Sequence, residues 1–233
     1  MPEEFSLGLA EVDVAVRRAG LPANWHPFEI PSAGATIDEH EQIAAEAWES
    51  LRARRLAERD KLDADVEHTL RTWTLPDVLI IVRAVEIADN RKVFYRATIA
   101  DGLGVYSELV PDGIKFVRIR PDHLVDDLVT ILPRYGPLPV SPASIVPASP
   151  DRDALAPFAA WAPHRHGTFE LSTRHGHGKL HPVGTVSFTD TEGGRYLTFT
   201  EPLPGGDARQ HFVPSDGSHL RRWLHETIAE TRD

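Results

Sequence analysis

The chain contains no cysteine among its 233 residues. Disulfides, a thiol nucleophile and metal sites with sulfur ligands are therefore excluded, and a reducing compartment fits this composition. No apolar run approaches the roughly 20 residues that a membrane-spanning helix needs. The acidic start, MPEEFSLGLAEVD, also lacks the basic flank and apolar stretch of a signal peptide. We therefore expect a soluble protein of the cytoplasm.

Positive charge is also scarce, since 25 Lys and Arg stand against 35 Asp and Glu, for a net charge of −10. Such a surface repels nucleic-acid phosphates and anionic lipid headgroups, so we expect neither nucleic acid nor membrane as a partner. The hydrophobic content of 41%, with five Trp and nine Phe, is that of a globular protein with a sizeable core.

The first 75 residues carry mainly helix signals. Apolar residues recur at helical spacing over 9–19, over 36–55 behind a T-x-x-E capping box, and over 63–73 behind an aspartate N-cap. In the third of these helices the expected buried stripe is Val66, Leu70 and Trp73. We expect the last two helices to form a helical hairpin. Between the first two, the proline-bracketed segment 26–31 is typical of a short edge strand.

From residue 77 the hydrophobic period changes to that of strands. Strands are expected over 77–88, 93–101, 104–110 and 114–120, followed by a helix that Pro121 opens. Residues 133–150 contain six prolines and form an extended linker, in which SIVP could pair briefly with a sheet. Strand signals return over 167–175, 182–190, 194–201 and 210–214. A last helix covers about 216–230, with Leu220, Leu224 and Ile228 facing inward.

The two halves of the chain resemble each other. At one constant offset, Phe116, Val117, His123, Leu124 and Leu128 match Phe212, Val213, His219, Leu220 and Leu224. At a second offset, Val85, Asp89 and Tyr95 match Val186, Asp190 and Tyr196. These matches predict a duplication: two similar halves, 1–132 and 151–233, joined by the linker 133–150. The expected fold is α+β, with a pseudo-two-fold central antiparallel sheet and two helical bundles.

A histidine-rich stretch raises the question of catalysis. HRHGTFELSTRHGHGKLH, residues 164–181, holds five of the twelve histidines, and His-x-His pairs on strands could hold Zn²⁺ or Ni²⁺. Three glycines and only one carboxylate favour instead a mobile polar loop at a hairpin tip. The chain has no G-x-S-x-G nucleophile elbow. A histidine-liganded metalloenzyme or hydrolase is thus the alternative, and no metal or cofactor is the preferred prediction.

VSFTDTEGGRYLTF and HFVPSDGSHLRRWLHETIAE resemble the C-terminal signature of the EspG family, the chaperones of type VII (ESX) secretion systems in actinobacteria. The resemblance implies a cytosolic protein without enzymatic activity, which binds the apolar tip of a helical PE–PPE substrate dimer, keeps it soluble and delivers it for export. It also implies an antiparallel sheet with two helical bundles. Residues 173–181 depart from the family pattern, so no family contact is transferred there.

Five residues are the candidate partner-binding positions: Trp161, Phe188, Arg195, Phe199 and Trp223. Exposed aromatic residues often anchor protein partners. Core packing is the competing interpretation for Trp161, Phe188 and Phe199. A homodimer of the unloaded protein, or a homodimeric adaptor unrelated to secretion, is the alternative assembly.

Overall fold

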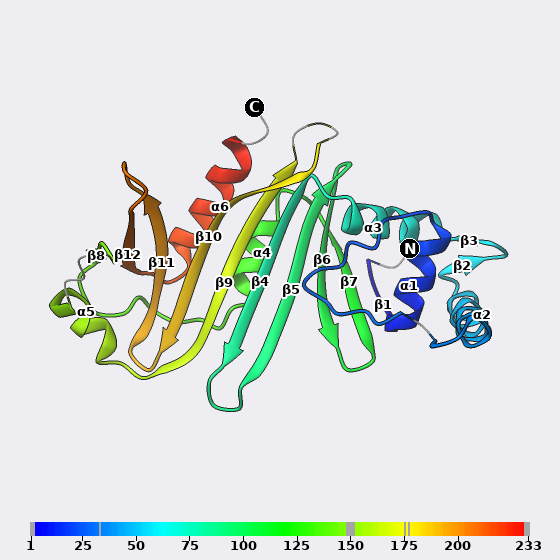
Figure 1. Cartoon of the computed structure of the whole chain (residues 1–233), viewed down its shortest axis with the longest axis horizontal. Helices are drawn as coiled ribbons and strands as arrows, with labels where there is room; N and C mark the ends of the chain where they lie inside the picture. The colour runs from blue at the N-terminus through cyan, green and yellow to red at the C-terminus, as the bar shows by residue number, and fades with distance from the viewer. Residues whose placement is uncertain (1–2, 33, 148–151, 175, 177, 231–233) are drawn as a thin grey trace. The chain divides into compact units, whose positions relative to one another are not determined.

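The structure is a computed structural model that describes residues 3–32, 34–147, 152–174, 176 and 178–230 (Figure 1). The chain divides into two units. Unit 1 comprises Met1–Leu79 and Phe94–Leu124, and unit 2 comprises Ile80–Val93 and Val125–Asp233. Both contain helices and antiparallel strands, which confirms the predicted α+β class.

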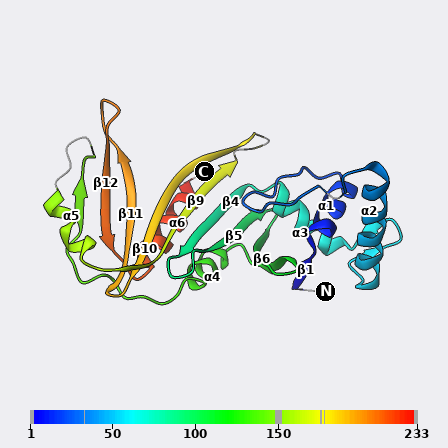
Figure 2. The same ribbon diagram turned by 60° about the horizontal axis from the view of Figure 1, so that its bottom comes forward.

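In the described part of unit 1 the helices are α1 (Leu9–Arg18), α2 (Ile37–Ala53) and α3 (Ala64–Thr74). The predicted capping box is present at α2, where the Thr36 hydroxyl accepts a hydrogen bond from the Glu39 amide at 3.2 Å. Asp63 caps α3, whose buried stripe is the predicted one. The predicted α2–α3 hairpin is wrong. The small hairpin β2 (Ala57–Glu58) and β3 (Lys61–Leu62) separates the two helices in the chain, and α2 packs on α1 (Figure 2).

The strands of unit 1 follow the order β1-β7-β6-β5, with β1 at Glu4–Leu7, β7 at Gly113–Ile119, β6 at Leu103–Val110 and β5 at Arg91–Ala100. The core forms where α3 meets this sheet. Trp73 is fully buried, packs edge-on against Phe116 at 5.1 Å between ring centroids, and donates its indole N–H to the Ser107 hydroxyl. Such a partner is what a buried indole nitrogen requires.

The strands of unit 2 follow the order β4-β9-β10-β11-β12-β8, in which β4 covers Val78–Glu86. Their bounds are β9 Pro163–Arg174, β10 Leu180–Thr191, β11 Gly194–Pro202, β12 Ala208–Pro214 and β8 Ala143–Ile145. The brief pairing expected inside the proline-rich linker is confirmed, because β8 pairs with β12.

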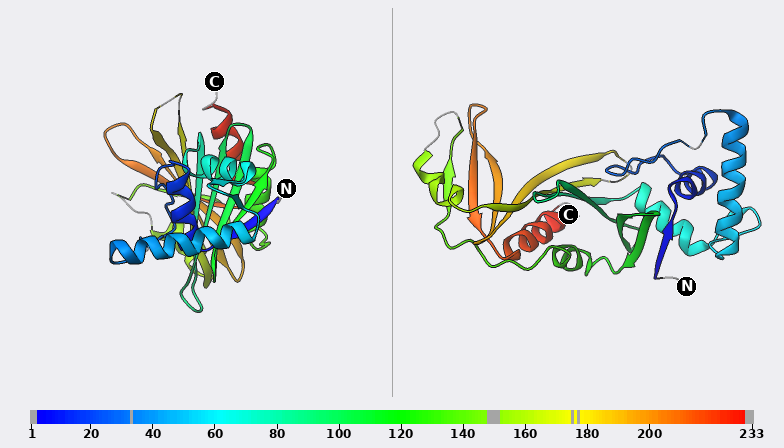
Figure 3. Two further views of the ribbon diagram at one scale, coloured as in Figure 1. Left: turned by 90° about the vertical axis from the view of Figure 1, so that its right-hand side faces the viewer. Right: turned by 90° about the horizontal axis from the view of Figure 1, so that it is seen from below.

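Three further helices are α4 (Leu124–Thr130), α5 (Arg152–Ala159) and α6 (Ser218–Glu230). α6 buries Leu220, Leu224 and Ile228 as predicted, and it lies along one face of the β10–β11 region (Figure 3). Among the described residues, no helix is both long and apolar enough to cross a membrane.

Several predicted elements need correction. Residues 26–31 form a turn, a bend and irregular backbone rather than a strand, and they pair with no other strand. The helix expected to open at Pro121 begins at Leu124, after a turn. The short strands β1, β2 and β3 and the helix α5 were not predicted, because elements of two to eight residues carry little periodicity.

The strand orders of the two units bear on the duplication. In each unit a short strand, β1 or β8, lies at one end of the order and pairs with the last strand of a meander, β7 or β12. The first set of sequence matches agrees with this correspondence, since it aligns β7 and α4 with β12 and α6. The second set of sequence matches is displaced by one strand. It pairs Tyr95 of β5 with Tyr196 of β11, whereas β5 and β10 hold the same place when the strands are counted from β1 and from β8.

Candidate functional site

A groove of about 320 Å³ opens between α6 and the strands β10 and β11 in unit 2. Its residues are Val183, Gly184, Thr185, Val186, Leu197, Phe199, Thr200, His219, Leu220, Arg222, Trp223 and Glu226. Large apolar side chains are rarely exposed in the described part of the chain, yet two of them line this groove: Val183 is 41% exposed and Phe199 38%. The groove therefore presents an apolar floor between polar rims.

A β-bulge shapes the floor. The register between β9 and β10 shifts between Pro182 and Gly184, which leaves Val183 as an extra residue. A bulge of this kind redirects a side chain out of the regular pleat. Beside it, the Trp223 ring lies over the backbone of Gly184, where an added Cβ would come within 3.1 Å of the ring. The glycine thus lets the indole close one side of the groove.

A polar network borders the floor on β11, β12 and β8. The His211 ring stacks on Phe199 at 4.9 Å between centroids. Its Nε2 lies 3.0 Å from a Glu201 carboxylate oxygen, and its Nδ1 lies 2.9 Å from the Ser144 hydroxyl. Arg209 also contacts Glu201 at 3.4 Å. His211 thereby holds the Phe199 ring at one edge of the groove.

The structure brings two of the five candidate residues together, because Phe199 and Trp223 both line the groove. Phe188 and Arg195 require correction: they are 1% and 2% exposed, so their side chains are core. Phe188 packs on Phe169 at 5.8 Å. Trp161 lies half-buried against the β10–β11 turn, where a Cβ on Gly193 would come within 2.4 Å of its ring.

The hairpin DTEGGRY, residues 190–196 of the stretch that resembles the family signature, has a structural role. The Arg195 guanidinium pairs with the fully buried Asp190 carboxylate at 2.5 Å and donates to the Pro133 carbonyl at 2.9 Å. Its backbone bonds Gly136 and Leu138, which fastens the proline-rich linker to β11. A Cβ on Gly194, whose φ is +141°, would collide with the same linker segment. The motif joins β10, β11 and the linker.

The histidine stretch is mostly strand, and the expected loop is therefore much shorter. His164 and His166 lie in β9 and His181 lies in β10, because the apolar residues between them form a buried β9 face. His166 contacts the Thr189 hydroxyl at 2.9 Å. His175 and His177 lie outside the described residues. Among the residues described, no group of three His, Asp or Glu could hold a metal ion.

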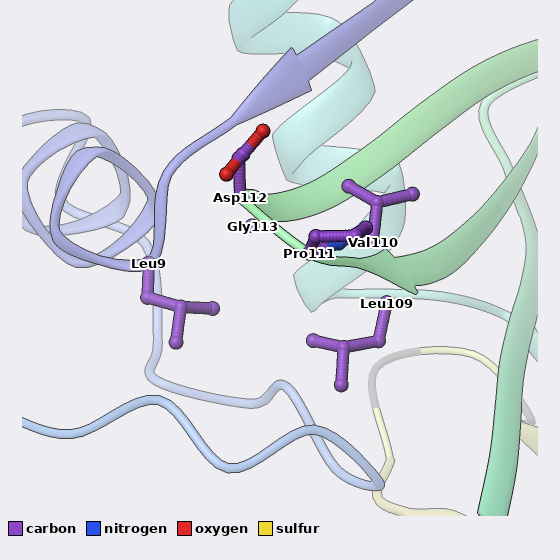
Figure 4. Close-up of a pocket in the computed structure, with 6 residues that line it drawn as sticks. All are labelled: Leu9, Leu109, Val110, Pro111, Asp112 and Gly113. Carbon is purple, nitrogen blue, oxygen red and sulfur yellow. The ribbon is translucent and has the colours of Figure 1, made fainter.

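A second groove, of about 540 Å³, lies in unit 1 between the start of α1 and the β6–β7 turn (Figure 4). Leu9 and Leu109 face it from the two sides, with Val110 and Pro111 beside them. Leu109 is 51% exposed. This groove has a larger volume than the first, and fewer residues line it, none of them aromatic.

Sequence reasoning missed Val183 and Arg222, which line the first groove, and His211, which stacks on Phe199 beside it. Val183 follows a proline and precedes a glycine, a pattern that signals a bulge. His211 carries no local signal, because its contacts come from strands that are distant in the sequence. Arg222 could have been found on the helical wheel, since it lies on the polar side of α6 beside Trp223.

The comparisons with known proteins agree with this architecture. The model of the EspG family matches residues 9–226, and the chain belongs to that family. The structure is similar to that of the Mycobacterium tuberculosis type VII secretion system chaperone EspG5 in complex with a PE25–PPE41 dimer. The two align with a TM-score of 0.66 and 10% sequence identity, over 98% of this chain and 96% of EspG5. A search of the curated proteins gave no match.

Proposed function

We propose that this protein is a cytoplasmic chaperone and adaptor that binds a PE–PPE-like helical heterodimer and delivers it to a type VII secretion system. The observation that carries the proposal is membership of the EspG family over residues 9–226. The similarity of fold to a chaperone solved with such a dimer supports it. The role requires no catalytic group and no cofactor.

The α6–β10–β11 groove is the docking surface in this proposal. A helical substrate with an exposed apolar tip aggregates in water, and covering that tip removes the apolar surface from solvent. Val183, Phe199 and Trp223 supply an apolar floor, and charged residues of α6 supply a polar rim. An apolar centre within a polar rim is the usual organisation of protein interfaces.

Release of the client also fits a groove of this size. A floor with three large apolar residues buries far less area than a permanent interface. The complex is therefore held by a few anchors, and the loss of one of them accelerates dissociation. Trp161, half-buried at the β10–β11 turn, remains a predicted further contact.

The test is co-expression of the tagged chain with a PE–PPE heterodimer from its own host, followed by size-exclusion chromatography with light scattering. We expect a complex of one copy of each protein. Phe199→Ala and Trp223→Ala should each weaken binding by about 2 kcal/mol or more if they are anchors. Ile37→Ala, at a position 79% exposed on α2, is the matched control and should leave binding unchanged.

Two results would contradict the proposal. One is a folded chain that binds no PE–PPE heterodimer of its host. The other is a complex that tolerates both groove substitutions, which would place the docking surface elsewhere in the molecule.

A further inference from the structure

The α6 rim of the groove carries a cation and an anion four residues apart, Arg222 and Glu226. Arg222 and Glu226 are both exposed, and both line the groove. Within the described part of the chain neither takes part in an ion pair. Their neighbours do: Arg221 pairs with Asp126 at 2.7 Å.

The order of the two residues along the helix is the one that favours a pair between them less. Residues at i and i+4 are neighbours on a helix surface, but an acid that precedes a base is the more stable order. Here Arg222 precedes Glu226, which is the weaker order. Their backbone positions are about 6 Å apart along the helix axis. The rim therefore presents one positive and one negative group to whatever enters the groove.

From this pattern we infer that the groove selects a client helix with an apolar side chain flanked by an acidic and a basic residue one turn apart. The acidic residue faces Arg222, the basic residue faces Glu226, and the apolar side chain enters between Val183, Phe199 and Trp223. The inference rests on the proposed function and adds to it which client surface is accepted and in which direction the client helix runs.

Charge complementarity at such a rim supplies specificity more than affinity. An exposed ion pair contributes little in water, whereas a partly desolvated pair at an interface contributes more. A client helix that entered in the reverse direction would place like charges together at both positions. Such contacts act against wrong partners and wrong orientations. The apolar floor fixes the depth of insertion, and the two charges fix its direction.

Charge reversal provides the experiment, with the same host PE–PPE heterodimer as the probe. Its Kd is measured by biolayer interferometry for the intact chain, Arg222→Glu and Glu226→Arg, at about 50 mM and about 500 mM salt. At low salt each reversal should raise the Kd about tenfold, because an attraction becomes a repulsion. The difference should shrink at high salt, where exposed charges are screened.

Lys92→Glu is the matched control for Arg222→Glu, because it makes the same change of charge on an exposed residue of β5 outside the groove. This variant should leave the Kd within about twofold of the value for the intact chain. Circular dichroism melting verifies that each variant is folded.

The outcomes separate the two proposals. If the intact chain binds no heterodimer, the proposed function fails, and the inference fails with it. If it binds, and Phe199→Ala weakens binding while both reversals leave the Kd within about twofold, the groove stands and the charge assignment is overturned. Tighter binding by Glu226→Arg would also overturn it, because a uniformly acidic client would then be indicated.

Discussion

Arg195 and Asp190 show how a surface-like motif can belong to the core. A hairpin tip rich in glycine and charge suggests solvent exposure, and Arg195 was expected to contact a partner. The structure buries both side chains and satisfies the guanidinium with a carboxylate and a carbonyl. The motif itself gives no indication of this, because the covering segment is the linker, some 60 residues earlier in the chain.

Removal of the buried charge partner should be costly. Asp190→Asn leaves the Arg195 cation uncompensated, so we expect the free energy of unfolding to fall by about 3–5 kcal/mol. Urea denaturation followed by circular dichroism measures the change. Glu192→Gln, at an exposed position of the same hairpin, is the control and should change stability by less than about 0.5 kcal/mol. A loss below about 1 kcal/mol for Asp190→Asn would show that the pair is not buried as described.

Gly193 offers a second test at the residue scale. A Cβ at this position would approach the Trp161 ring to 2.4 Å, so Gly193→Ala must displace the indole. We expect a loss of about 1–3 kcal/mol, as for other overpacked sites, with a shift in tryptophan emission. Gly136→Ala is the matched control, because a Cβ added at this glycine would meet no atom within 4 Å. Equal stability of the two variants would argue against the Trp161 contact.

At the scale of elements, the helices were predicted more accurately than the sheet. The capping box of α2, the Asp63 cap of α3 and the apolar stripe of α6 are all local signals, and all are confirmed. The bulge at Val183 and the docking of the linker on β11 depend on pairing between distant segments. For this reason the sequence indicated Phe199 and Trp223 as candidates but did not show that they share a groove.

Asp216 makes the stability of the start of α6 depend on pH. Its carboxylate accepts a hydrogen bond from the Ser218 amide at 3.0 Å, and hydrogen bonds from Ser218 hold the pKa of this carboxyl below its usual value. A group whose pKa is lowered by folding adds stability above its unfolded pKa, and that stability is lost as the pH falls through the folded pKa.

We therefore expect the difference in melting temperature between the intact chain and Asp216→Asn to be largest near neutral pH. It should shrink as the pH falls below the usual aspartate value of about 4. Asparagine keeps an oxygen acceptor but does not titrate there. Differential scanning calorimetry across this range measures the difference. A gap that stays constant with pH would exclude Asp216 as its source.

At the scale of the whole molecule, the α+β class was predictable because helix signals and strand signals cluster along the chain. The similar strand orders of the two units support the proposed duplication into halves 1–132 and 151–233. The compact units follow other boundaries, since residues 80–93 belong to unit 2. Sequence periodicity reports single elements and carries no information on how a chain is partitioned between units.

Client binding should protect one unit selectively. If the proposed docking surface is correct, amide hydrogen exchange in β10, β11 and α6 should slow about tenfold or more with the heterodimer bound, whereas α1 and α2 should be unchanged. Mass spectrometry of peptic fragments measures the difference. Protection centred on Leu9 and Leu109 would identify the unit 1 groove as the binding surface instead.

The buried hairpin of Asp190 and Arg195 has a consequence for how relatives of this protein are compared. In this chain the hairpin that carries much of the resemblance to the family holds the scaffold together, and its Arg195 contacts the linker rather than a groove. A shared hairpin motif therefore indicates a shared scaffold and gives no information about which cargo is bound. If the proposed docking groove is correct, we expect differences at the positions of Val183, Arg222 and Glu226 to change which cargo is bound. Sorting the family by cargo should begin with the outer side of α6 and the bulge beside it.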